Sequence, residues 1–131
     1  MELLKKYLIE VFASMFFLLF VFCIIKIGQS CSLDEMFVDH INNALAVGIK
    51  VGLYYYTTAA NITQAMSDAG WIKAPVANYL KGESPGMGIW YDVEDPSIAD
   101  ADVTSICAEF IQQMKMAGYS NIGIYSSYDW P

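Results

Sequence analysis

The regular alternation of strand-like and helix-like segments after Gly28 constrains this fold more than any other feature of the sequence. Runs rich in β-branched and aromatic residues occur at Lys50 to Tyr56, Ile89 to Val93 and Ile122 to Ser126. Segments with apolar residues at helical spacing separate these runs. Such alternation is typical of βα units, in which the strands form a parallel sheet and the helices cover it.

Three helices are expected around these runs. Ser32 and Glu35 form an S-x-x-E pattern that predicts a capping box at the start of the first helix, and Gly48 is expected to follow its end. The expected first residues of the other two helices are Asn61 and, for the third, Asp100 or Asp102.

Such repeats either close into a barrel or remain an open, doubly wound sheet. The sequence has no glycine-rich phosphate loop of the GxGxxG or Walker type, which makes a nucleotide-binding open sheet less favoured. We therefore expect an α/β fold of the TIM-like (β/α) barrel kind with parallel strands.

The composition and charge of the chain limit the classes of partner that it can bind. The 131 residues suit one domain, and the 14 acidic residues outnumber the 7 basic ones without a basic cluster beyond Lys5 and Lys6. Nucleic acid is therefore not an expected partner.

Cysteines occur only at Cys23, Cys31 and Cys107, an odd number without metal-ligand spacing. We therefore expect them to be small buried apolar side chains, and we expect neither a disulfide framework nor a zinc site.

The N-terminal segment has two interpretations, and both remain open. Lys5 and Lys6 precede an apolar run from Val11 to Ile25, as in an export signal or membrane anchor. Alternatively, Phe22 to Ile27 is a buried strand of the barrel. We prefer the strand, because the chain continues from it without a linker, and we divide the chain into an apolar segment over residues 1–21 and a domain over residues 22–131.

Asp92 and Glu94 in the segment W-Y-D-V-E are the best candidates for chemistry. Side chains alternate along a strand, so both should project from the same face at its carboxyl end, with Cβ atoms roughly 6 to 7 Å apart. That separation suits the paired carboxyl groups of glycosidases, and their repulsion together with burial should raise the pKa of one of them. Two alternatives are solvated or helix-capping acids, and a metal site that includes Asp95 but lacks a partner motif.

Tyrosines adjoin this predicted site. Tyr54 and Tyr56 share one face of their strand, whereas Tyr55 points to the other. Tyrosines near the carboxyl end of a strand can stack on sugar rings, and they can equally pack in a core.

These residues resemble a known family, the lysozymes of glycoside hydrolase family 25. F-C-I-I-K-I-G is similar to the family's second strand, and the segment from L-D-E-M-F to L-Y-Y-Y-T is similar to its following helix and third strand. I-W-Y-D-V-E-D is similar to the strand that carries its D-x-E motif, and G-Y-S-N-I-G-I-Y-S-S-Y-D-W to its fifth strand. The resemblance covers Phe22 to the end of the chain.

The resemblance implies an N-acetylmuramidase that cleaves the β-1,4 bond between N-acetylmuramic acid and N-acetylglucosamine in the glycan strands of peptidoglycan, without a cofactor or metal. Glu94 would be the proton donor, and Asp92 would orient the substrate's N-acetyl group. Tyr54, Tyr56 and Tyr125 would line the substrate groove. Such an enzyme would act outside the cell or anchored to the membrane and facing the wall.

The sequence also departs from the family. Nothing in Met1 to Val21 resembles the family's first strand, which carries an aspartate of the site, and the chain stops at Pro131 before the final strands. The resemblance therefore implies an incomplete barrel, shortened at both ends and preceded by an apolar, helix-like segment. A non-catalytic, membrane-tethered barrel remnant remains the alternative function.

Overall fold

The computed structural model describes residues 1–9 and 22–130. Residues 2–9 form a short helix whose side chains are all exposed. Within the described parts of the chain, no helix is both long and apolar enough to cross a membrane. The predicted export signal or anchor falls mainly on residues 10–21, which lie outside the described residues.

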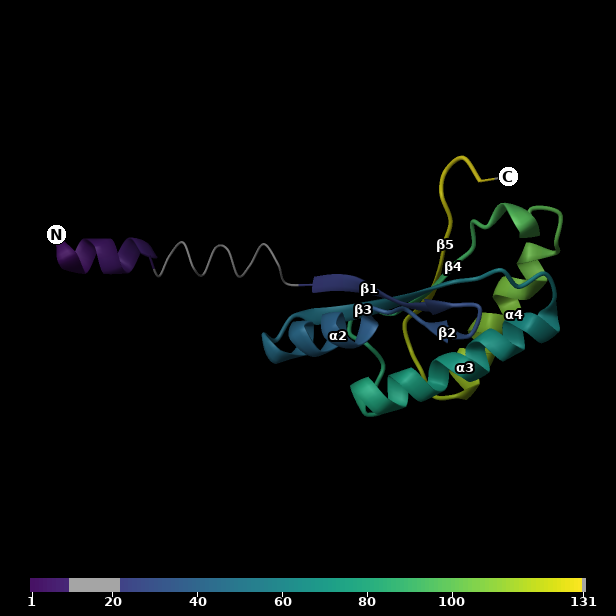
Figure 1. Cartoon of the computed structure of the whole chain (residues 1–131), viewed down its shortest axis with the longest axis horizontal. Helices are drawn as coiled ribbons and strands as arrows, with labels where there is room; N and C mark the ends of the chain where they lie inside the picture. Colours follow the sequence, from purple (N-terminus) through teal and green to yellow (C-terminus); the bar gives the residue numbers. More distant parts are fainter. Residues whose placement is uncertain (10–21, 131) are drawn as a thin grey trace.

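The domain is built on one five-stranded sheet with the order β2-β1-β3-β4-β5 (Figure 1). In the part of the chain that the structure describes, four strands run parallel and β2 alone pairs antiparallel, along β1. The predicted parallel sheet is thus confirmed. The strands are β1 (Phe22–Gln29), β2 (Ser32–Leu33), β3 (Lys50–Tyr56), β4 (Ile89–Asp92) and β5 (Ile122–Tyr125).

The preferred interpretation of Phe22 to Ile27 as a strand is confirmed. β1 pairs with β3 from Phe22 opposite Lys50 to Gln29 opposite Tyr56, with one shift of register between Lys26 and Gly28. Ile25 and Ile27 are buried, as expected for a strand covered by helices.

Three helices connect the parallel strands: α2 (Phe37–Ala46), α3 (Ile62–Leu80) and α4 (Val103–Met116). Two of the predicted caps are confirmed. The Asn61 side chain accepts a hydrogen bond from the Gln64 N–H at 2.9 Å, and Asp102 accepts one from the Ser105 N–H at 3.1 Å. These bonds satisfy backbone donors that have no partner within the first turn of a helix.

The capping box predicted at Ser32 is wrong. Ser30 and Cys31 both have left-handed backbone angles, with φ of 49° and 53°, and they turn the chain back so that Ser32 pairs with Gln29. α2 therefore begins only at Phe37, and its N-terminal neighbour Met36 makes no side-chain cap. The S-x-x-E pattern did not predict the helix start because Ser32 pairs with Gln29 in a tight β-hairpin and so cannot cap a helix.

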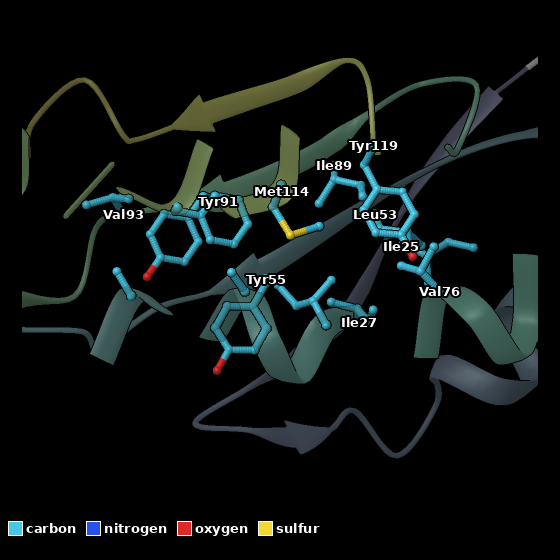
Figure 2. Packing of buried hydrophobic residues seen from close by; sticks show 14 of the residues in the cluster. Ile25, Ile27, Leu53, Tyr55, Val76, Ile89, Tyr91, Val93, Met114 and Tyr119 are labelled. Atoms are coloured by element: carbon cyan, nitrogen blue, oxygen red, sulfur yellow. The ribbon is translucent and has the colours of Figure 1, made fainter. Parts of the chain in front are cut away.

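The helices pack on one face of the sheet, and the hydrophobic core lies between the helices and the sheet (Figure 2). Side chains alternate along β3 and β4, so every second residue enters this core. The fully buried large side chains include Leu53, Tyr55, Ile89 and Tyr91 from the sheet and Phe37, Ile41, Ile72, Ile106, Phe110 and Met114 from the helices.

The prediction of three buried cysteines is wrong, because none of them is fully buried. Cys23 and Cys107 are half-buried, but Cys31 is exposed in the β1–β2 turn. The left-handed conformation of this turn, rather than burial of an apolar side chain, determines where Cys31 lies.

Candidate active site

The face of the sheet opposite the helices carries a pocket of about 500 Å³. Residues at alternate positions of the parallel strands point into it, together with Glu94, which lies two residues beyond the end of β4. The lining residues are Ile24, Tyr54, Trp90, Asp92, Glu94 and Tyr125. We refer to this pocket as the groove.

Asp92 and Glu94 line the groove together, so the predicted projection of both side chains into one cleft is confirmed. Val93 between them is buried on the helix side. Asp92 is only 5% exposed, and its Oδ1 atom is buried without a hydrogen-bond partner among the described residues. Glu94 is half-buried. A buried carboxyl oxygen with no partner is energetically costly.

The surroundings of Asp92 raise the pKa of its carboxyl group. Burial, followed by repulsion from Glu94, raises the pKa of Asp92 from 3.8 to about 6, although the positive charge of Lys26 lowers it. The predicted raised pKa of one carboxyl group is therefore found on the more buried acid. Lys26 lies on β1 opposite Tyr54, and its ammonium group also contacts Gln29 Oε1 at 2.6 Å.

This pKa shift makes a prediction about stability. Because the folded-state pKa of Asp92 is above its unfolded value, folding is favoured at low pH and this advantage is lost as pH rises through about 6. Asp92→Asn removes the buried charge, so we expect it to raise the free energy of unfolding at pH 7 by about 2 kcal/mol. Urea unfolding at pH 7 and pH 4 measures this. At pH 4 the two proteins should be nearly equally stable, and an equal difference at both pH values would contradict the prediction.

The predicted tyrosines separate into two groups. Tyr54 and Tyr125 line the groove. Tyr56 shares the face of Tyr54, but its hydroxyl donates a hydrogen bond to Asp95 Oδ2 at 3.0 Å, and it is not among the groove-lining residues. Burial and the Asp95 carboxylate raise the pKa of Tyr56 to about 12.

Asp95 has a structural position beside the site. It precedes the 3₁₀-helix η1 (Pro96–Ile98), and its side chain accepts hydrogen bonds from the Ser97 N–H at 2.9 Å and from the Ser97 hydroxyl. These bonds lower the pKa of Asp95. Asp95 thus caps η1, and its carboxylate is occupied by Ser97 and Tyr56.

Sequence reasoning missed Trp90 as a groove residue. Its indole N–H donates to the Met87 carbonyl oxygen at 2.8 Å, and the ring lies against Gly123 of β5. A Cβ atom at Gly123 would come within 2.5 Å of the ring, so glycine is what allows the indole to lie there. The signal was present, because Trp90 stands two residues before Asp92 and must share its face.

Among residues 1–9 and 22–130, no group of three or more His, Cys, Asp or Glu side chains is placed to hold a metal ion. A parallel sheet covered by helices on one face, with two carboxyl groups and aromatic side chains at the carboxyl end of a strand, is the arrangement of the α/β-barrel glycoside hydrolases. The chain belongs to glycosyl hydrolases family 25, whose sequence profile matches residues 20–131.

Solved structures agree with this assignment. The modular autolysin LytC of Streptococcus pneumoniae is 30% identical, with a TM-score of 0.72 over 81% of this chain. The catalytic domain of an endolysin from a bacteriophage of Listeria monocytogenes is 19% identical, with a TM-score of 0.69 over 81% of this chain, and shows the fold alone. No match was found among curated proteins.

The matched part is a fraction of each relative. It covers 26% of the autolysin chain and 52% of the endolysin catalytic domain. The five-stranded sheet therefore corresponds to part of a larger, barrel-like domain in these relatives, which confirms the expected partial α/β barrel.

Proposed function

We propose that this chain carries the carboxyl pair of a lysozyme-type muramidase. The observation that carries the proposal is the placement of Asp92 and Glu94 in one aromatic-walled groove. The substrate would be the β-1,4 bond between N-acetylmuramic acid and N-acetylglucosamine. A structure of the autolysin LytC in complex with a synthetic peptidoglycan ligand, which is 28% identical over 81% of this chain, supports this substrate class. Action at the cell wall, outside the cell, follows from the same proposal.

The two acids would have different roles, which we assign from the position of each in the D-x-E motif rather than from its burial. Half-buried Glu94 would donate a proton to the leaving glycosidic oxygen. Ionised Asp92 would accept a hydrogen bond from the N-acetyl N–H and so orient the acetyl oxygen for attack on the anomeric carbon. Water would then open the cyclic intermediate as Glu94 takes its proton.

The aromatic side chains would bind the sugar rings. Tyr54 and Tyr125 stand on strands that flank β4, and Trp90 lies between them. Aromatic faces and the C–H groups of sugars make a dry contact that excludes water from the reacting bond. Tyr56 would contribute indirectly, because its hydroxyl donates a hydrogen bond to Asp95 beside the groove.

The test uses the full chain on purified peptidoglycan, with analysis of the reducing ends that are released. A muramidase produces new reducing ends of N-acetylmuramic acid, whereas a glucosaminidase produces those of N-acetylglucosamine. Release of the first kind that depends on Glu94 supports the proposal. No release above background by the wild type would instead favour the non-catalytic remnant. Equal release by wild type and Glu94→Gln would show that Glu94 is not the acid.

Gly123→Ala tests the groove wall. The new Cβ would meet the Trp90 ring at 2.5 Å and push the indole away from β5. We expect the dissociation constant for an N-acetylglucosamine oligomer, measured by calorimetry, to rise about five-fold, which corresponds to roughly 1 kcal/mol. Gly86→Ala is the matched control, because nothing lies within 4 Å of its added Cβ. Unchanged affinity in both variants would exclude Trp90 from sugar binding.

A further inference from the structure

A buried carboxylate lies behind the sheet, on the side away from the groove. Asp68 of α3 is 7% exposed. Its Oδ1 accepts a hydrogen bond from the Tyr55 hydroxyl at 2.7 Å, and its Oδ2 accepts one from the Tyr91 hydroxyl at 2.7 Å. The Thr57 hydroxyl lies 2.7 Å from the same Oδ2. Figure 2 shows Tyr55 and Tyr91 with their hydroxyl oxygens at the same end of the apolar cluster.

The network reaches two neighbouring strands and the turn after a third. Tyr55 lies near the end of β3, Thr57 directly follows β3, and Tyr91 belongs to β4. The Tyr55 hydroxyl also accepts a hydrogen bond from the Cys31 N–H at 2.8 Å, which ties in the turn after β1. Burial and the nearby Asp68 raise the pKa of both tyrosines, so their hydroxyl groups remain donors.

Asp92 is held through members of this network. Its carbonyl oxygen accepts a hydrogen bond from the Thr57 N–H at 3.0 Å. Its neighbour Tyr91 is fixed at one end by Asp68 and along its ring by Phe110, with ring centroids 3.9 Å apart and planes 3° from parallel. The backbone of Asp92 thus lies between two residues that Asp68 anchors.

An acid at position 68 is unfavourable for packing alone. The other buried residues of α3 are small or apolar, among them Ala65, Ala69 and Ile72. Burying a charge costs free energy even when hydrogen bonds satisfy it, and an apolar side chain of similar volume is often as stable. A packing role therefore does not account for a carboxylate at this position.

We propose that Asp68 is a positioning residue, which acts from the helix side of the sheet to fix the carboxyl ends of β3 and β4 and thereby the Asp92 side chain in the groove. Its importance for catalysis rests on the proposed function of Asp92. Its effect on the position of Asp92 does not, and can be measured without an assay of lysis.

The experiment follows the protonation of Asp92 by the ¹³C chemical shift of its carboxyl carbon in wild type, Asp68→Asn and Thr57→Val. The wild-type midpoint should lie near 6, because Asp92 is buried. If the strand ends loosen, water reaches Asp92 and the midpoint should fall by about one unit in both variants. Asp68→Asn also removes a negative charge, so Thr57→Val, which keeps that charge, separates position from electrostatics.

Ile41→Val is the matched control. Ile41 is fully buried on α2, and loss of one methyl group should lower the stability without moving the midpoint of Asp92. Unchanged midpoints in both network variants would overturn the proposal, as would an equal shift in Ile41→Val. If Asp68→Asn does not fold by circular dichroism, Thr57→Val alone decides.

Kinetics provide the second readout. We expect kcat of Thr57→Val to fall about ten-fold while KM stays within about two-fold, because binding is kept and the acid pair is misplaced. If the wild type releases no reducing ends, the proposed function fails, and the titration of Asp92 still tests the role of Asp68.

Discussion

Glu94→Gln is expected to lower the release of reducing ends from peptidoglycan by at least about 100-fold, because an amide cannot donate a proton to the leaving oxygen. Glutamine has nearly the same size and keeps the half-buried side chain in the groove, so the fold should not change. Rates on purified peptidoglycan, with thermal unfolding of both proteins as a check, measure the effect.

Asp95→Asn is the matched control for this substitution. Asp95 follows Glu94 directly, but its carboxylate is occupied by Ser97 and Tyr56. We expect more than half of the wild-type rate to remain, with a small loss of stability from the weakened cap. Equal loss in both variants would show that Glu94 is not the acid. Activity that survives in Glu94→Gln but not in Asp92→Asn would reverse the two roles.

Phe110→Ala is expected to cost about 3–5 kcal/mol of the free energy of unfolding, the largest effect on stability that we predict. The Phe110 ring is fully buried on α4 and stacks on Tyr91. Its loss leaves a cavity directly behind β4. Because small domains are stable by only about 5–15 kcal/mol, the variant should unfold at a much lower urea concentration.

Met116→Ala is the control, since it removes a large apolar side chain from the same helix. Met116 is 69% exposed, so its replacement should change the free energy of unfolding by about 0.5 kcal/mol or less. If Phe110→Ala destabilises no more than Met116→Ala, the stacked pair does not carry the packing of α4 on the sheet.

The alternation of elements predicted the parallel strands and α3 and α4 correctly, because their signals are local. Asn61 and Asp102 cap the helices that follow them, and the strands are short apolar runs. The β1–β2 turn could not be predicted in the same way. It places Ser30 and Cys31 in left-handed conformations that neither residue prefers, and pairing with β1 together with the Tyr55 hydroxyl compensates for this.

Local sequence patterns also predicted only part of the candidate site. Strand alternation alone was enough to place Asp92 and Glu94 on one face, and Tyr55 on the other. It could not show that Tyr56 donates to Asp95, which lies 39 positions later in the chain. Nor could it reveal Asp68, because its partners come from two strands and meet it only through the packing of α3 against the sheet.

The one-sided covering of the sheet has a consequence for how this chain can change in evolution. In β3 and β4 the residues that face the groove are Tyr54, Trp90 and Asp92. The buried residues on the helix side are Val51, Leu53, Tyr55, Ile89 and Tyr91. One layer of backbone therefore separates residues under selection for chemistry from residues under selection for folding. Substitutions at groove positions can alter what is bound with little loss of stability. Core positions that do not contact the Asp68 network can vary without changing the groove. A saturation-mutagenesis scan of these strands, selected once for folding and once for binding, should show a pattern that alternates along each strand. Groove residues should tolerate substitution in the selection for folding, and core residues should not.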